Sequence, residues 1–245
     1  MRHGHAYHNF MHAELQRAGA VISDVDEYSV ARAERRFYLQ PALQDPPLTA
    51  LGREDAKLLR QRIAELQQER QVEVGHQGQS SAVFAPDLFI VSPLRRATQT
   101  VLLAFQDCLA ARPTVPVVAL ESCREQHGIY YSDKRSDMDD YAVEFPRVSI
   151  EHVEFNEDVL WEEREREEAT TQLARHREFL HFLRNQEDSC QVVVGTHSGW
   201  LHSLVNDSLH AVGDEDEVSR IRSEFSNGEM RSLLLTWEDE SNGMI

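Results

Sequence analysis

Residues 88–100 read Leu-Phe-Ile-Val-Ser-Pro-Leu-Arg-Arg-Ala-Thr-Gln-Thr, and this stretch decides the fold class of the chain. Its first four residues form a short continuous apolar run, as expected of a strand that is buried on both faces. Ser92-Pro93 ends the run, and residues 96–109 follow with the apolar spacing of a helix. The stretch therefore predicts a buried strand that passes directly into a helix.

Comparable patterns predict the other elements. Further strands are expected at 115–120, 191–194 and 232–237, and amphipathic helices at 49–66, at 161–186 and after His197. In the helix over 161–186 the expected inward side chains are Ala169, Leu173, His176, Leu180 and Leu183. Residues 71–86 predict a loop, and residues 121–160 predict irregular chain with short helices. Because strands alternate with helices, we expect a three-layer α/β/α sandwich with a mainly parallel central sheet.

Length and composition limit the classes of protein. At 245 residues the chain suits one large α/β domain, which we place at 1–238, with 126–160 as a cap insertion and 239–245 as a disordered tail. The formal charge of −17 opposes binding to nucleic acid or to an anionic membrane surface. No stretch approaches the roughly 20 apolar residues that cross a bilayer. Three scattered cysteines predict reduced thiols and a cytoplasmic protein.

Several polar groups follow the ends of predicted strands. Parallel sheets bind ligands at the carboxyl ends of their strands, where Ser92 to Arg96, the segment after Leu120 and Thr196-His197 should converge. Arg2-His3-Gly4 and Asn9, near the amino terminus, add a guanidinium, an imidazole and an amide. Guanidinium groups bind phosphate oxygens through two parallel hydrogen bonds. The combination predicts a site for a phosphate group.

These residue types support a two-step displacement. We expect His3 to attack phosphorus while Glu125 gives a proton to the leaving oxygen, after which water hydrolyses the phosphohistidine. Arg2, Arg96 and a cationic His197 would stabilise the charge of the transition state. Since these cations supply positive charge, the mechanism needs no metal or other cofactor.

Four blocks, in order along the chain, resemble the histidine phosphatase superfamily of phosphoglycerate mutase-like proteins. They are Arg2-His3-Gly4 with Asn9, Pro47-Leu48-Thr49 through Gly52, Ser92 to Thr100, and Val194 to Gly199. The stretches Cys123 to Gly128, Ser132 to Ser136 and Asn156 to Trp161 are similar to its plant and fungal branch.

The resemblance implies a phosphoglycerate mutase-like fold and a phosphoric monoester hydrolase of the histidine acid phosphatase type. It implies His3 as nucleophile and Glu125 as proton donor, with Arg2, Arg96 and His197 in the phosphate pocket. The expected substrate is a small phosphorylated metabolite or a phosphoprotein. Segments 10–45 and 126–160 are expected to roof the pocket and set its specificity.

Two alternative functions remain open. One is phosphoglycerate mutase-type phosphoryl transfer, although mutases of this superfamily carry Glu after Arg-His-Gly, where this chain has His5. The other is a catalytically impaired phosphate-binding or interaction module, because the family enters Arg-His-Gly from a central strand that is here truncated to Met1. We expect either an upstream start codon or compensation elsewhere in the chain, because the sheet would otherwise lose a ladder on each side of this strand.

Some neighbouring residues have simpler interpretations. His3, His5 and His8 resemble a metal-binding run, but Arg2 opposes a cation, so we expect His5, His8 and His12 at the pocket wall or the surface. Glu121 competes with Glu125 for the acid role, and Arg95 is expected to be solvated. The charged run Glu162 to Glu168 predicts a solvated helix face.

Overall fold

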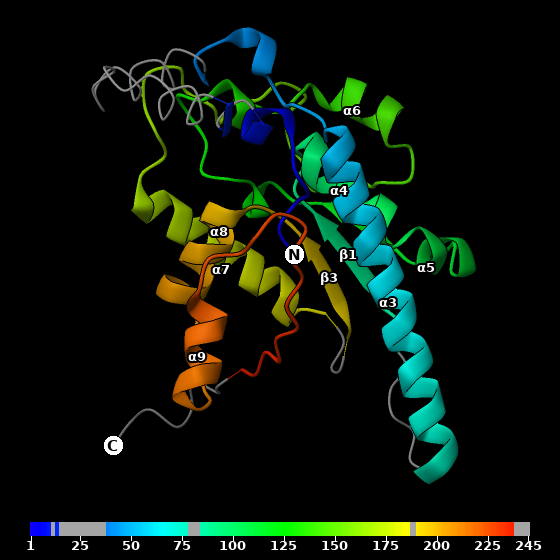
Figure 1. Ribbon diagram of the computed structural model, residues 1–245. Coiled ribbons are helices and arrows are strands. Elements are labelled where there is room, and N and C mark those ends of the chain that lie inside the picture. The colour runs from blue at the N-terminus through cyan, green and yellow to red at the C-terminus, as the bar shows by residue number, and fades with distance from the viewer. Residues whose placement is uncertain (11–12, 15–37, 78–83, 187–189, 238–245) are drawn as a thin grey trace, which may run out of the picture.

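The computed structural model describes residues 1–10, 13–14, 38–77, 84–186 and 190–237. Among these residues, β1 (Leu88–Val91), β2 (Val117–Ala119) and β3 (Val192–Gly195) form a parallel sheet in the order β2-β1-β3. Phe89 of β1 lies opposite Val117 on one side and Val193 on the other. The expected parallel sheet of an α/β fold is confirmed (Figure 1).

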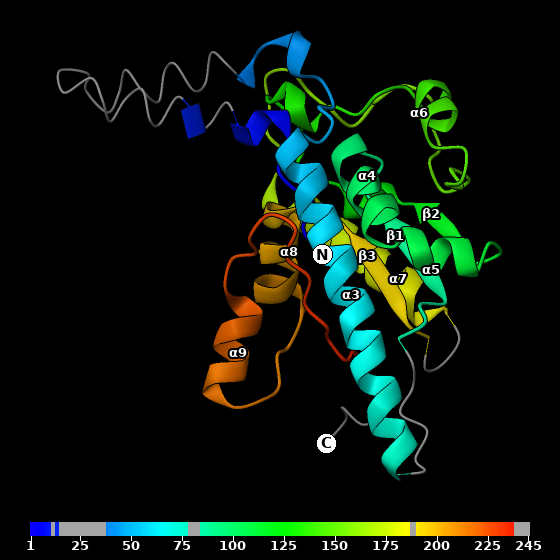
Figure 2. The same ribbon diagram turned by 45° about the vertical axis from the view of Figure 1, so that its right-hand side comes forward.

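Helices cover both faces of the sheet. From residue 40 on, the helices of the described part are α3 (Ala50–Gln77), α4 (Arg95–Ala104), α5 (Gln106–Ala111), α6 (Met138–Glu144), α7 (Ala169–Arg184), α8 (Ser198–Ser203) and α9 (Glu215–Arg222). Single turns are η1 (Pro41–Leu43), η2 (Glu121–Cys123), η3 (Tyr131–Asp133) and the π-helical η4 (Leu204–Ser208). Helices α3, α4 and α5 lie on one side of the strands, and α7 and α8 lie on the other (Figures 1 and 2).

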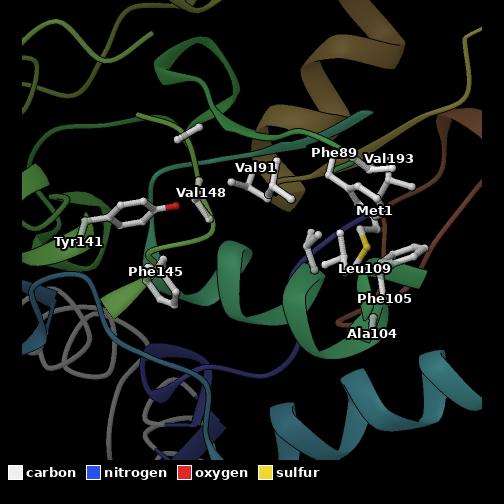
Figure 3. Packing of buried hydrophobic residues seen from close by; sticks show 14 of the residues in the cluster. Met1, Phe89, Val91, Ala104, Phe105, Leu109, Tyr141, Phe145, Val148 and Val193 are labelled. Atoms are coloured by element: carbon white, nitrogen blue, oxygen red, sulfur yellow. The ribbon is translucent and has the colours of Figure 1, made fainter. Parts of the chain in front are cut away.

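Side chains that alternate along β1 build two apolar cores. Phe89 and Val91 pack with Phe105 and other side chains of the α4 and α5 side, whereas Leu88 and Ile90 pack in the core that contains Trp200. All four β1 side chains are buried, as the continuous apolar run predicts. Figure 3 shows the first core from close by.

Residues 1–3 lie beside β3 in the position of a further strand. Arg2 forms an isolated parallel bridge with Thr196, whose N–H donates to the Met1 carbonyl at 2.9 Å. On the other side, Gly228 N–H donates to the carbonyl of His3 at 3.0 Å. Met1 is buried in the core near Phe89 and Val193 (Figure 3). The first strand is reduced to one isolated bridge, as its truncation to Met1 predicts, but the tripeptide that carries His3 is still hydrogen-bonded on both sides.

The largest correction concerns the predicted helix over 161–186. Helix α7 begins only at Ala169, and residues 161–168 are irregular. Its buried face contains Gln172, Arg175, His176 and Phe179, whereas Ala169 is exposed. The run Glu162 to Glu168 is not helical, and although residues 162–165 and Glu168 are exposed as predicted, Glu167 is buried and paired with Arg175.

Smaller differences occur elsewhere. Residues 71–77, expected in a loop, continue α3, and the helix predicted from Arg96 to Leu109 is divided between α4 and α5 at Phe105. The strand predicted at 232–237 is wrong, since this segment has no regular structure and Leu234 is 91% exposed. The predicted tail, 239–245, lies outside the described residues.

Candidate active site

A cavity of about 780 Å³ lies beyond the carboxyl ends of β1 and β3. Its wall contains Arg2, His3, His8, Asn9, Tyr38, Arg96, Glu125, Gln126, Ile129, Tyr130, Ser132, Asp133, Arg166, Ser198 and Gly199. All the predicted site residues except His197 are in this wall. His197 lies directly behind it, with its ring centroid 5.1 Å from that of His3. The structure thus brings together residues that are nearly 200 positions apart in the chain.

His3 has a defined tautomer. Its Nδ1 lies 2.7 Å from the Gly4 carbonyl, which can only accept, so Nδ1 carries the hydrogen. Nε2 therefore keeps its lone pair and accepts from Nε of Arg96 at 3.3 Å. Burial and then the charge of Arg96 hold the pKa of His3 well below its usual value. The imidazole is thus neutral, with a nucleophilic nitrogen turned toward the guanidinium.

Close backbone packing holds the His3 loop in place. Gly4 N–H donates to Thr100 Oγ1 at 3.0 Å, and His5 N–H donates to Asp55 at 3.0 Å. A Cβ on Gly4 would lie 2.6 Å from the carbonyl oxygen of Gly52, and one on Gly52 would lie 1.9 Å from that of His5. Only glycine fits at these two positions, which explains both glycines of the sequence blocks.

His197 is buried beneath the pocket. Its Nε2 shares a hydrogen bond with Ser92 Oγ at 2.8 Å, and Nδ1 has no partner within the described structure. Burial, followed by the charge of Arg96, lowers the pKa of His197 well below its usual value. The cationic His197 expected from the sequence is therefore not the form that the protein groups favour. Anionic oxygens beside the imidazole would favour its protonation.

Glu125 is held at the start of α8. Its carboxylate accepts from the backbone N–H groups of Gln126 (3.0 Å), Trp200 (3.0 Å) and Gly199 (3.2 Å). A Cβ on Gly199 would lie 2.5 Å from Glu125 Oε1, so the close approach requires glycine. Burial and then the charge of Asp133 raise the pKa of Glu125 above its usual value. A carboxyl group that keeps its proton can serve as a general acid.

Comparison with known proteins decides the family. The model of the histidine phosphatase superfamily (branch 1) matches residues 29–230. The chain belongs to this superfamily. The match begins after residues 1–9, so the roles of Arg2 and His3 rest on the geometry of the pocket.

The curated relatives include phosphoglycerate mutase-like proteins of the plant Arabidopsis thaliana and a probable phosphoglycerate mutase of the fungus Arthroderma benhamiae. Phosphoglycerate mutase-like protein 1 of Arabidopsis thaliana is 34% identical over 49% of this chain and 42% of its own length. A second Arabidopsis phosphoglycerate mutase-like protein is 29% identical over 61% of this chain and 63% of its own length. The chain therefore spans less than two thirds of the length of these two relatives. Among solved structures, the α-ribazole phosphatase from Shigella flexneri is 16% identical, with a TM-score of 0.46, over 93% of this chain and 85% of its own.

Glu121, the alternative candidate for the acid role, belongs to a different network. It accepts from Arg124 Nη1 at 2.9 Å and from Arg135 Nε at 2.5 Å, and both guanidinium groups are buried. Asp158 completes the network with a 2.6 Å bond from Arg124 Nη2. Glu121 is not in the cavity wall. The network supports the backbone that leads into Glu125.

The other residues interpreted from the sequence are found in different places. Arg95 forms a half-exposed ion pair with Glu144, away from the cavity. His8 lies in the cavity wall, His5 bonds Thr49 through its ring, and His12 lies outside the described residues. Within the described ranges, no group of His, Cys, Asp and Glu residues could hold a metal ion, and no helix is long and apolar enough to cross a membrane.

Several residues in or behind the wall have no role predicted from the sequence. Ser92, in the segment expected to converge on the site, lies outside the wall and bonds the ring of His197. Arg166 was assigned to a solvated run, yet its Nη1 donates to Asp133 at 2.8 Å and its guanidinium lies 4.7 Å from the ring of Tyr130. Asp133 belongs to a stretch that resembles the plant and fungal branch, and Tyr130 lies in the 126–160 segment that is expected to roof the pocket. No local pattern marks a residue that reaches a site through tertiary packing.

Proposed function

We propose that this chain is a metal-independent phosphatase that hydrolyses a phosphate monoester through a phosphohistidine on His3. The observation that carries the proposal is that both ring nitrogens of His3 are hydrogen-bonded, one as donor and the other as acceptor. Nδ1 donates to Gly4, which leaves the Nε2 lone pair beside Arg96 at the pocket wall. A neutral imidazole held in one tautomer next to a fixed cation is suited to attack a phosphorus atom.

The proton movements follow from the states of the groups. Nε2 of His3 forms the bond to phosphorus as the bond to the leaving oxygen breaks, and Glu125 gives its proton to that oxygen. The Glu125 carboxylate then takes a proton from water, which attacks the phosphohistidine and releases phosphate. The raised pKa of Glu125 supports its start as a protonated acid.

Phosphate oxygens would find several donors in the wall. Arg2 donates through Nη1 to the Phe225 carbonyl at 2.7 Å, and its buried Nε has no partner within the described structure. Asn9 Oδ1 accepts from Ala6 N–H at 3.0 Å, which directs the amide nitrogen elsewhere. We assign Arg2, Asn9 and Arg96 to the phosphate, with His197 behind them. The two guanidinium groups supply the positive charge that many phosphoryl-transfer enzymes take from Mg²⁺.

We propose hydrolysis in preference to mutase-type transfer because His5 occupies the position where mutases of the superfamily carry Glu. The side chain of His5 bonds Thr49 and is not in the cavity wall. The hydrogen bonds around residues 1–3 support an ordered nucleophile loop, which opposes the impaired-module alternative. We further propose a cytosolic enzyme of small phosphorylated metabolites or phosphoproteins, supported by Cys108 and Cys123, which form no disulfide.

The purified chain should hydrolyse p-nitrophenyl phosphate in EDTA, and His3→Ala should abolish the reaction. His210→Ala, at an exposed histidine far along the chain, is the matched control and should keep full activity. A strict requirement for added metal would contradict the mechanism. Interconversion of monophosphoglycerates without release of phosphate would support the mutase alternative.

A further inference from the structure

A buried carboxylate lies within this otherwise cationic pocket. Asp133 is 5% exposed, and its two oxygens contact different guanidinium groups. Oδ1 accepts from Arg96 Nη2 at 3.1 Å, and Oδ2 accepts from Arg166 Nη1 at 2.8 Å. A negative charge in a phosphate site repels the substrate, so its presence needs an explanation.

Asp133 completes the set of contacts that orients Arg96. The guanidinium donates through Nε to His3, through Nη1 to the Ser132 carbonyl at 2.6 Å, and through Nη2 to Asp133. The last two contacts come from η3, which therefore determines which edge of the guanidinium faces His3. A phosphate oxygen that approaches Nη2 must compete with the carboxylate already there.

Asp133 also belongs to the electrostatic surroundings of Glu125. The charged groups that act on the Glu125 side chain include Arg2 of the amino-terminal segment, Arg96 of α4 and Asp133 of η3. Helix α7 adds Arg175, whose Nη2 donates to the backbone carbonyl of Glu125 at 3.4 Å. Helix α8 adds only backbone N–H groups. Within this set Asp133 is the sole carboxylate, and its charge raises the pKa of Glu125.

We propose that Asp133 is a positioning residue with two effects: it orients Arg96 toward His3 while competing with phosphate for that guanidinium, and it places a negative charge in the cavity wall that it shares with Glu125. The second effect rests on the proposed function, whereas the first requires only that the pocket binds oxyanions. Weak retention of phosphate would help a hydrolase release its product. The two effects predict opposite changes, because removal of the charge should strengthen anion binding while it weakens catalysis.

The test compares Asp133→Asn with the charge-preserving Asp133→Glu and with Asp140→Asn, the same change at an exposed position of α6. Titration calorimetry with inorganic phosphate and with tungstate gives the affinities. Initial rates with β-glycerophosphate, whose alkoxide leaving group needs a proton, give the pH profile. For Asp133→Asn we expect anion binding about ten-fold tighter, a lower kcat at pH 7 and an alkaline limb at lower pH.

Asp133→Glu and Asp140→Asn should keep the wild-type anion affinity within about three-fold, since both leave the charge of the pocket unchanged. Unchanged or weaker anion binding by a folded Asp133→Asn variant would overturn the proposal. If that variant does not fold, Asp133→Ser removes the same charge with a smaller side chain. Failure of both neutral variants to fold, while Asp133→Glu folds, would show a structural role and also overturn it.

The two readouts also separate this proposal from the proposed function. A wild-type protein that binds tungstate but hydrolyses no phosphate ester would contradict the phosphatase. In that case, tighter tungstate binding by Asp133→Asn would still support competition between Asp133 and the anion.

Discussion

Arg96 Nε donates to Nε2 of His3 across 3.3 Å, although 93 positions separate the two residues in the chain. The contact joins the amino-terminal loop to the first turn of α4 and sets a cation beside the proposed nucleophile. The contact also agrees with the tautomer of His3: Nε2 accepts from Arg96, and Nδ1 carries the hydrogen that it donates to the Gly4 carbonyl. The proposed chemistry depends on this one pair more than on any other.

Arg96→Lys should lower kcat about a hundred-fold, because an ammonium group cannot reproduce three directed N–H contacts from one plane. Arg95→Lys is the matched control, since the neighbouring side chain pairs with Glu144 outside the cavity. Steady-state rates with p-nitrophenyl phosphate measure both effects. Equal losses of kcat in the two variants would mean that the start of α4, and not the guanidinium of Arg96, determines the rate.

Glu125→Gln should slow the hydrolysis of an alkyl phosphate by about 10²- to 10³-fold. The same change should slow p-nitrophenyl phosphate far less, because nitrophenolate leaves without a proton. Glu121→Gln, in the neighbouring arginine network, should lower stability without this dependence on the leaving group. A comparison of the two substrates across both variants identifies the acid, and a stronger dependence in Glu121→Gln would contradict our assignment.

Glu167 should contribute a stability that depends on pH. Burial alone would raise its pKa, but hydrogen bonds from His127 and Arg175 hold the pKa at about 2. Since this folded-state pKa lies below that of an unfolded glutamate, the contribution is present above about pH 4.5 and is lost as pH falls toward 2. Urea unfolding should show Glu167→Gln less stable than wild type at pH 6, with a smaller difference at pH 3.

Glu168→Gln changes an exposed neighbour and should leave the free energy of unfolding nearly unchanged at both pH values. A Glu167→Gln deficit of the same size at pH 6 and pH 3 would mean that packing, and not charge, stabilises this position.

An apolar extension before Met1 should stabilise the fold. The amino group of Met1 donates to the Val194 carbonyl at 2.5 Å, and burial lowers its pKa to about 5. An extended peptide that continues this parallel ladder would next donate to the Val192 carbonyl. It would fill an apolar cavity of about 550 Å³ that Met1, Val192, Val194 and Leu233 help to line.

The added sequence Val-Ile-Val should therefore raise Tm by about 3 °C in a thermal scan. Val-Pro-Val is the matched control, because proline removes the N–H that would bond Val192. An equal Tm for both extensions would show that no ladder forms.

The sequence predicts the central layer well because the evidence there is local. The apolar runs of β1 and β3 are recognisable without any distant partner, and the blocks around Arg96 and His197 predict the place of the cavity at the ends of these strands. The segments predicted wrongly depend on tertiary contacts. Residues 161–168 are predicted as helix, but they are irregular in the structure. Glu167 pairs with Arg175 and His127, and Arg166 donates to the Gly128 carbonyl at 2.7 Å.

Electrostatic states were the least predictable feature. The sequence predicts a cationic His197, but burial and the charge of Arg96 lower its pKa and so favour the neutral imidazole. Asp133 has no signature of its own in the sequence, since its effect arises only when η3 packs against α4. Burial and distance between charged groups come from the fold, and no spacing within one segment reports them.

The phosphohistidine on His3 is the central claim, and trapping it tests the claim most directly. The enzyme, mixed with p-nitrophenyl phosphate in EDTA, would be denatured in alkali within milliseconds and its peptides examined by mass spectrometry. We predict a phosphoryl group on His3 in the wild type and none in His3→Ala. A phosphoryl group on another residue, or steady turnover with His3 never modified, would contradict the account.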